Sequence, residues 1–187
     1  MKKLISLLLS IILVLSLSAC EYSVVVTDEE GNTSTVASNK QEKTIELEGP
    51  YDVVRVVDGD TIIIDLDGDK VRVRFANVDT PESVASEESG KENTQEGVEA
   101  SDYTKSLLTY GAKVYLEYDE KVVDKYDRVL AYVYLDDGKT MIQRLLLEDG
   151  MAKVFDDHDN KRYTDEFYKL QDNAKANKKG IWNDNNG

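Results

Sequence analysis

The sequence predicts an α+β fold that is mainly β, in which five strands close a small barrel and about three helices pack against it. Three observations support this class. The 187 residues, 41% hydrophobic and 32% charged, suit one folded domain with an ordinary core. Short β-branched runs separated by tight acidic turns fill the middle of the chain. Longer runs with helical character, two of them followed by glycine, lie mostly in the second half.

The first 20 residues predict an export signal. Two lysines precede an apolar run, residues 4–17, that is too short for a membrane-spanning helix. The run ends in Leu-Ser-Ala-Cys, which resembles the bacterial lipoprotein box and implies a lipid anchor on Cys20. An ordinary cleaved signal that leaves Cys20 as a free thiol is the alternative. Both interpretations export the chain, and the first places it on the outer side of the bacterial cell membrane, with later shedding left open.

Residues 21–50 predict an acidic, flexible linker. They carry seven acidic and two basic side chains, and Gly31–Thr35 is rich in turn-forming residues. Such a segment has too little apolar surface to form a core. Ser23–Thr27 is β-branched and could form a short edge strand, but a linker is the favoured interpretation. The folded domain is then expected over residues 51–187.

The elements of this domain follow from local patterns. Acidic Asp-Gly-Asp turns at residues 58–60 and 67–69 separate three strand-like runs, which predicts a β-meander. The expected strands are Val53–Val57, Thr61–Leu66, Val71–Phe75, Lys113–Tyr118 and Val129–Leu135. The expected helices are Glu96–Tyr110, Met141–Glu148 and Thr164–Lys178. Five strands with a helix between the third and the fourth are compatible with an OB-fold barrel.

Two acidic turns are the first candidates for a functional site. Asp60 precedes the second strand, and Asp79-Thr80-Pro81-Glu82 follows the third. Because a meander places the start of its second strand beside the end of its third, Asp60 and Asp79 are expected to converge. Two carboxylates and the Thr80 carbonyl are oxygen ligands that suit Ca²⁺ or Mg²⁺. Taken singly, each motif is more often an ordinary turn.

Two arginines are placed to bind an anion. Arg74 precedes Asp79 by five residues, and Arg128 ends the segment Asp124-Lys125-Tyr126-Asp127-Arg128. A guanidinium group makes planar, bidentate contacts to phosphate oxygens, whereas surface ion pairing is the alternative. The net charge of −14 argues against a generally basic, nucleic-acid-binding surface. An anionic substrate therefore requires a local site of this kind or a bound cation.

Together these motifs resemble the staphylococcal nuclease (thermonuclease) family. The resemblance is carried by Val56–Thr61, Val73–Glu82, Asp124–Arg128, Gly150–Val154 and Gly180–Trp182. It implies a five-stranded OB barrel with three helices. It also implies a Ca²⁺-dependent endonuclease, a hydrolase that cuts DNA and RNA to leave 3′-phosphate and 5′-hydroxyl ends. We expect a secreted member of the lipoprotein type that acts as a monomer.

The resemblance implies roles for individual residues. The implied calcium ligands are Asp60, Asp79 and the backbone carbonyl of Thr80. The implied catalytic residues are Arg74 and Arg128, which contact the scissile phosphate, and Glu82, which activates or orients the attacking water. Lys125 and Tyr126 are further candidates for contact with the substrate.

Some residues depart from the family pattern. Asp127 stands where the family usually has glycine, and its carboxylate could compete with phosphate for Arg128. The loop Ser86–Glu92 is acidic where a basic loop would help to recruit nucleic acid. These departures keep open a second hypothesis, a non-catalytic OB-fold module that binds nucleic acid or protein.

Overall fold

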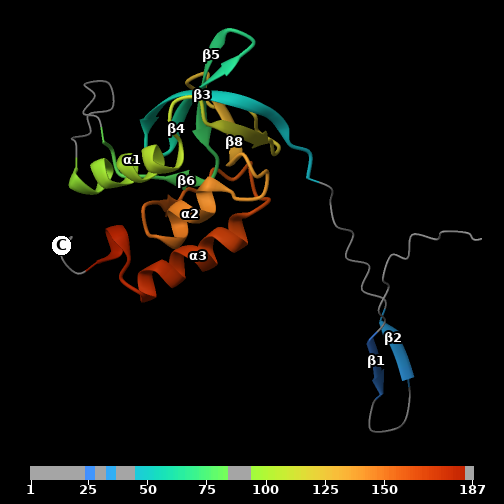
Figure 1. Cartoon of the computed structure of the whole chain (residues 1–187). Helices are drawn as coiled ribbons and strands as arrows, with labels where there is room; N and C mark the ends of the chain where they lie inside the picture. Colours follow the sequence, from blue (N-terminus) through green and yellow to red (C-terminus); the bar gives the residue numbers. More distant parts are fainter. Residues whose placement is uncertain (1–23, 28–32, 37–44, 84–93, 184–187) are drawn as a thin grey trace, which may run out of the picture. The chain divides into compact units, whose positions relative to one another are not determined.

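The computed structural model describes residues 24–27, 33–36, 45–83 and 94–183 (Figure 1). The chain divides into two compact units, Met1–Thr44 and Ile45–Gly187. The export signal with Cys20 and the acidic loop Ser86–Glu92 lie outside the described residues. Within the described ranges, no helix combines the length and the apolar character needed to cross a membrane.

The described residues of the first unit form a small antiparallel ribbon. Strand β1 (Val24–Thr27) pairs with β2 (Thr33–Val36), so that Val24 lies opposite Val36. β1 lies within Ser23–Thr27, the segment for which the sequence left open a short edge strand beside the linker interpretation. Two short segments rich in β-branched residues can pair through backbone hydrogen bonds without a core, which composition alone does not reveal.

The second unit contains a closed barrel of five strands in the order β3-β4-β5-β8-β7. Its strands are β3 (Glu48–Asp58), β4 (Thr61–Leu66), β5 (Asp69–Phe75), β7 (Lys113–Glu117) and β8 (Val129–Tyr134). All neighbours are antiparallel except β5 and β8, which run parallel. The predicted fold class, a five-stranded OB barrel with three helices, is confirmed.

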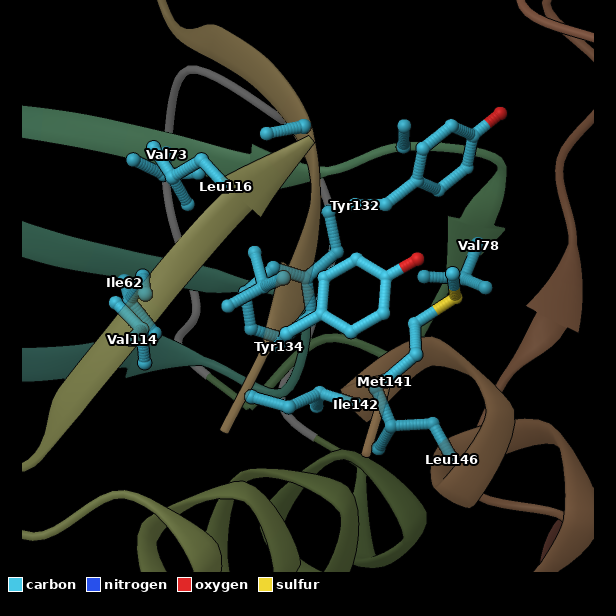
Figure 2. Close-up of a cluster of buried hydrophobic side chains, with 14 of the residues drawn as sticks. Ile62, Val73, Val78, Val114, Leu116, Tyr132, Tyr134, Met141, Ile142 and Leu146 are labelled. Atoms are coloured by element: carbon cyan, nitrogen blue, oxygen red, sulfur yellow. The ribbon is translucent and has the colours of Figure 1, made fainter. Parts of the chain in front are cut away.

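Alternation along the strands builds the core. Val73 and Phe75 on β5 point inward, whereas the intervening Arg74 faces outward, as expected for a period of two. The other barrel strands contribute further buried side chains, β8 along most of its length, and side chains of α2 join the same core. Figure 2 shows side chains from the barrel, including Ile62 and Leu116, gathered with Ile142 and Leu146.

Three α-helices pack around the barrel: α1 (Gln95–Leu107), α2 (Ile142–Glu148) and α3 (Thr164–Ala176). Thr94 caps α1, because its hydroxyl accepts a hydrogen bond from the Gly97 amide at 3.0 Å. The sequence placed the end of this helix three residues too late, at Tyr110. The structure ends it at Leu107, four residues before Gly111, which has a positive φ of 78°.

Local patterns missed three short elements. β6 (Val78–Asp79) pairs with β9 (Lys153–Val154), and η1 (Gly180–Trp182) is a single 3₁₀ turn. Two-residue strands have no periodicity to detect, so only their pairing across the fold identifies them. β3 begins at Glu48, five residues before the predicted strand start at Val53, because Glu48 pairs with Leu116 of β7.

Candidate active site

The β4–β5 hairpin brings the two acidic turns together. Thr61 lies opposite Arg74 in the register, and the Phe75 amide donates to the Asp60 carbonyl at 2.8 Å. β5 then leads through two residues into β6, which ends at Asp79. The residues before β4 and those after β5 therefore lie side by side, as the meander predicted.

Arg74 is the centre of this arrangement. Its Nη2 lies 3.0 Å from Asp60 Oδ2 and 2.8 Å from Asp79 Oδ1. Its Nη1 donates to two backbone carbonyls, those of Phe75 at 2.9 Å and Val78 at 2.6 Å. Only 11% of the arginine side chain is exposed. The guanidinium is thus fixed in orientation while its charge offsets the repulsion between the two carboxylates.

Asp60 joins the two turns. Its Oδ2 accepts hydrogen bonds from the amide of Thr80 at 2.9 Å and from the Thr80 hydroxyl at 3.2 Å. Its Oδ1 accepts from the Thr61 hydroxyl at 3.0 Å. Asp60 and Thr80 are both buried, whereas 45% of the Asp79 side chain is exposed. The structure brings Asp60, Asp79 and Thr80 into one cluster.

The donor chemistry of this cluster fits a hard cation. Ca²⁺ prefers carboxylate and carbonyl oxygens, and Asp60, Asp79 and the Thr80 carbonyl supply that set. Among the described residues, none donates a hydrogen bond to the Thr80 carbonyl, which belongs to a buried residue. The described part of the chain contains no group of three or more acidic, histidine or cysteine side chains arranged as a metal site. The two carboxylates of this donor set, Asp60 and Asp79, both pair with Arg74.

Glu82 follows Thr80 on the second turn and is half-buried. Its backbone carbonyl accepts a hydrogen bond from the Thr94 amide at 3.1 Å. The next residue, Ser83, donates from its hydroxyl to Asp58 Oδ1 at 2.6 Å. Burial raises the pKa of Asp58, although the hydrogen bonds from Ser83 and Gly59 oppose the shift. The chain that follows the Glu82 side chain is thus held by two hydrogen bonds, one to the Glu82 carbonyl and one from the Ser83 hydroxyl.

Asp124 holds Arg128. The Nε and Nη2 atoms of Arg128 both lie 2.7 Å from Asp124 Oδ2, and Asp124 Oδ1 accepts the backbone amides of Tyr126 and Arg128. Asp127 adopts a positive φ of 57°, the conformation that glycine favours at this position. The carboxylate that competes for Arg128 is therefore Asp124, while Asp127 supplies the backbone conformation of the turn.

Both arginines line one cleft with a volume of about 530 Å³. Asp79, Lys125 and Tyr126 line it as well, and 66% of Tyr126 is exposed. The Tyr126 ring has Lys125 Nζ 4.9 Å and Arg128 Cζ 5.4 Å from its centroid, which is within the range of cation–π contact. The cleft thus presents a flat aromatic face beside two cationic groups.

One wall of this cleft was not among the site residues expected from the sequence. The segment after β9 contributes Phe155, Asp156, Asp157 and His158, and Lys121 lies on the same side. Phe155 is an exposed aromatic residue, and the His158 side chain is 84% exposed, as a solvated loop residue would be. A phenylalanine followed by acidic residues was the available signal, but only the fold places it on the same cleft as Arg128.

The closed barrel defines an OB-fold protein, and comparison with known proteins specifies its family. Residues 72–184 match the family model described as staphylococcal nuclease homologue. The chain is 43% identical to a thermonuclease of Staphylococcus hyicus, over 78% of this chain and 79% of that protein. It is 43% identical to a thermonuclease of Staphylococcus intermedius, over 71% and 75% respectively. It is 33% identical to endonuclease YncB of Bacillus subtilis (strain 168), over 97% and 92%. The chain belongs to the staphylococcal nuclease family.

Proposed function

We propose that this chain, a nuclease and hydrolase by its family, is a calcium-dependent endonuclease for DNA and RNA that leaves 3′-phosphate and 5′-hydroxyl ends. One observation carries the proposal. Arg74 and Arg128 line the same cleft, and the oxygen-rich cluster of Asp60, Asp79 and Thr80 lies around Arg74. The thermonuclease and endonuclease relatives support the same activity.

The two arginines receive the scissile phosphate. A phosphodiester is anionic and repels an attacking hydroxide or water oxygen. Guanidinium groups fixed by carboxylates and carbonyls offset that charge without reorganising during the reaction. Their contacts strengthen as negative charge develops on the phosphate oxygens, which lowers the barrier rather than merely improving binding.

Asp60, Asp79 and the Thr80 carbonyl would hold the calcium ion. When bound, Ca²⁺ supplies positive charge beside the phosphate. Glu82 accepts a proton from the attacking water, whose oxygen bonds to phosphorus. The bond from phosphorus to the 5′ oxygen breaks, that oxygen takes up a proton from solvent water to become the 5′-hydroxyl, and Glu82 returns its proton to solvent. The phosphate stays on the 3′ side, which accounts for the proposed ends.

The first experiment measures cutting of single-stranded DNA and RNA by the whole chain in detergent, at several CaCl₂ concentrations and with EDTA. Glu82→Gln and Arg128→Ala should each lower the rate by about 10²-fold or more, which is typical of losing one catalytic group. Glu99→Gln, on the exposed face of α1, is the matched control and should cut at the wild-type rate. Near-normal turnover by Glu82→Gln would overturn the role of Glu82.

The calcium site has a test that does not depend on cutting. A ligand that binds only the folded protein raises its thermal midpoint as its concentration rises. We expect CaCl₂ to raise the thermal midpoint of the wild-type protein and to raise that of Asp79→Asn much less. The Asp79 side chain is half-exposed, so this substitution changes the packing little. A midpoint that is equally sensitive to calcium in both proteins would remove Asp79 from the ligand set.

The second candidate function is a binding module without catalysis. The acidic wall of the cleft, Asp156 and Asp157, and the net charge of −14 favour it. Such a module would leave single-stranded DNA intact at every calcium concentration, and a fluorescence anisotropy assay would decide whether it binds the strand at all.

The proposal also places the chain outside the cell as a monomer held by a lipid on Cys20. The Leu-Ser-Ala-Cys sequence at residues 17–20 supports it. Mass spectrometry of the mature N-terminus would detect the diacylglyceryl group. Cys20→Ser should shift the nuclease from the membrane fraction to the medium or abolish processing. An unmodified cysteine in a membrane-free protein would contradict the anchor.

A further inference from the structure

Gly97 of α1 faces the backbone of Glu82. A Cβ atom built on Gly97 would lie 2.0 Å from the Glu82 carbonyl oxygen, 2.3 Å from its carbonyl carbon and 2.8 Å from the Ser83 amide nitrogen. These atoms all belong to the backbone, so no side-chain rotation can relieve the clash. Gly97 has an ordinary helical φ, because it is not among the residues with positive φ. The position therefore requires glycine for space rather than for backbone conformation.

The same helix also contacts the turn that carries Asp60. The Thr104 hydroxyl, which is fully buried, donates to the Gly59 carbonyl at 2.6 Å. A Cβ on Gly59 would lie 3.0 Å from Ala100 Cβ and 2.8 Å from Thr80 Oγ1. α1 is thus in close contact with Gly59 at one point and with Glu82 at another.

Glycine is otherwise a poor choice at this place. It lies in the first turns of a 13-residue helix, where alanine would favour helix formation. The Thr94 amide, which precedes the helix, also donates to the Glu82 carbonyl at 3.1 Å, so the start of α1 contacts this residue twice. The contact is made to the backbone of the residue whose side chain is proposed to handle the proton.

We propose that Gly97 is a positioning residue for Glu82. The missing side chain lets α1 hold the Glu82 backbone at a fixed separation from the Asp60 turn, so that the Glu82 carboxylate is aimed at the attacking water. This inference rests on the proposed function of Glu82. A methyl group at residue 97 displaces Glu82 while leaving Arg74 and Arg128, on β5 and before β8, in place.

Gly97→Ala tests the inference in single-turnover and steady-state cutting of single-stranded DNA. A misplacement of about 1 Å lowers rates by about 10²-fold, so kcat should fall by about 10- to 100-fold. KM should stay within about threefold, since both arginines still bind the phosphate. Val98→Ala, at the next, exposed position of α1, is the control and should keep the wild-type kcat.

A double-mutant cycle separates positioning from general damage. If Gly97 acts through Glu82, adding Gly97→Ala to Glu82→Gln should cause little further loss. A wild-type kcat in Gly97→Ala, or an equal additional loss in the Glu82→Gln background, would overturn the inference while leaving the nuclease proposal intact. Absence of cutting by wild type would instead overturn the proposed function, and the inference with it.

Thr104→Val provides a second route if Gly97→Ala does not fold. It keeps the shape of the side chain but removes the donor to Gly59, which loosens the other contact of α1. We expect kcat to fall by about fivefold or more with KM unchanged, as for a misplaced catalytic group. A Thr104→Val protein with wild-type kcat would contradict the role of α1 as the spacer between the two turns.

Discussion

The Asp124 side chain both caps a backbone turn and fixes the guanidinium group of Arg128. It caps the turn that ends at Arg128 and pairs with the guanidinium of the same residue. Burial alone would raise the pKa of Asp124, but the hydrogen bonds from Arg128 and Tyr126 hold that pKa below its ordinary value. Folding therefore favours the charged form. The resulting stabilisation is present above the unfolded pKa of about 3.9 and is lost as the pH falls through the lower folded pKa.

Asp124→Ala should lower the free energy of unfolding by about 1–3 kcal/mol at pH 7, the range for losing hydrogen bonds to a charged group. The difference from wild type should shrink as the pH falls below about 4, since the wild-type carboxylate is then being protonated. Urea unfolding at several pH values measures both. A difference that stays constant down to the lowest accessible pH would show that the charge of Asp124 is not what stabilises the turn.

The buried amide of Gln143 on α2 hydrogen-bonds to the backbone of the barrel. Gln143 Oε1 accepts a hydrogen bond from the Val133 amide at 3.1 Å, and its Nε2 donates to the Ala131 carbonyl at 2.8 Å. The parallel β5–β8 pairing extends only from Val129 to Ala131, opposite Val73 to Phe75. Beyond that point the Gln143 side chain takes the place of a neighbouring strand and satisfies the backbone of β8.

Gln143→Leu should lower the free energy of unfolding by about 1–3 kcal/mol, because it leaves the buried Val133 N–H without an acceptor. The substituted side chain is similar in size, so the loss is not attributable to a cavity. Gln95→Leu, at an exposed position on α1, is the control and should change stability by less than about 0.5 kcal/mol. Equal midpoints in urea for Gln143→Leu and the control would contradict this role.

The charge of the whole molecule opposes its proposed substrate. The chain carries 37 acidic and 23 basic side chains, and its cleft has carboxylates on one wall. The attraction needed for an anionic strand is confined to Arg74, Arg128 and their surroundings. Long-range repulsion and short-range attraction therefore differ in their sensitivity to salt, because screening acts over the Debye length, about 30 Å at 0.01 M and about 8 Å at 0.15 M.

KM for single-stranded DNA should fall or stay level as NaCl rises from about 0.01 to about 0.15 M at fixed CaCl₂, because repulsion is screened before contact pairs are. Basic nucleic-acid-binding proteins behave in the opposite way: salt weakens their binding to nucleic acid, because binding releases counterions. KM is measured across a NaCl series in which the stated ionic strength includes the contribution of CaCl₂. A KM that rises about tenfold over this range would indicate several phosphate contacts outside the cleft.

The barrel strands and the three helices were predictable because their signals are local. Val71–Phe75 alternates apolar and basic residues, and Asp67-Gly68-Asp69 is a turn in any context. The residue types of the proposed site were also readable, because Asp60, Arg74, Asp79, Glu82 and Arg128 lie in recognisable segments. The small strands β6 and β9 were not, since each has two residues and gains its identity from a partner more than 70 positions away.

The sequence by itself determined the strand and helix periods, the acidic turns and the family. Only the tertiary structure decided how these groups are paired. It showed that Asp124 rather than Asp127 holds Arg128, that Arg74 bridges Asp60 and Asp79, and that a helical glycine faces the backbone of Glu82. The physical reason is range. Propensity and periodicity act between near neighbours in the chain, whereas hydrogen bonds, ion pairs and excluded volume act between whatever atoms the fold brings within a few ångströms.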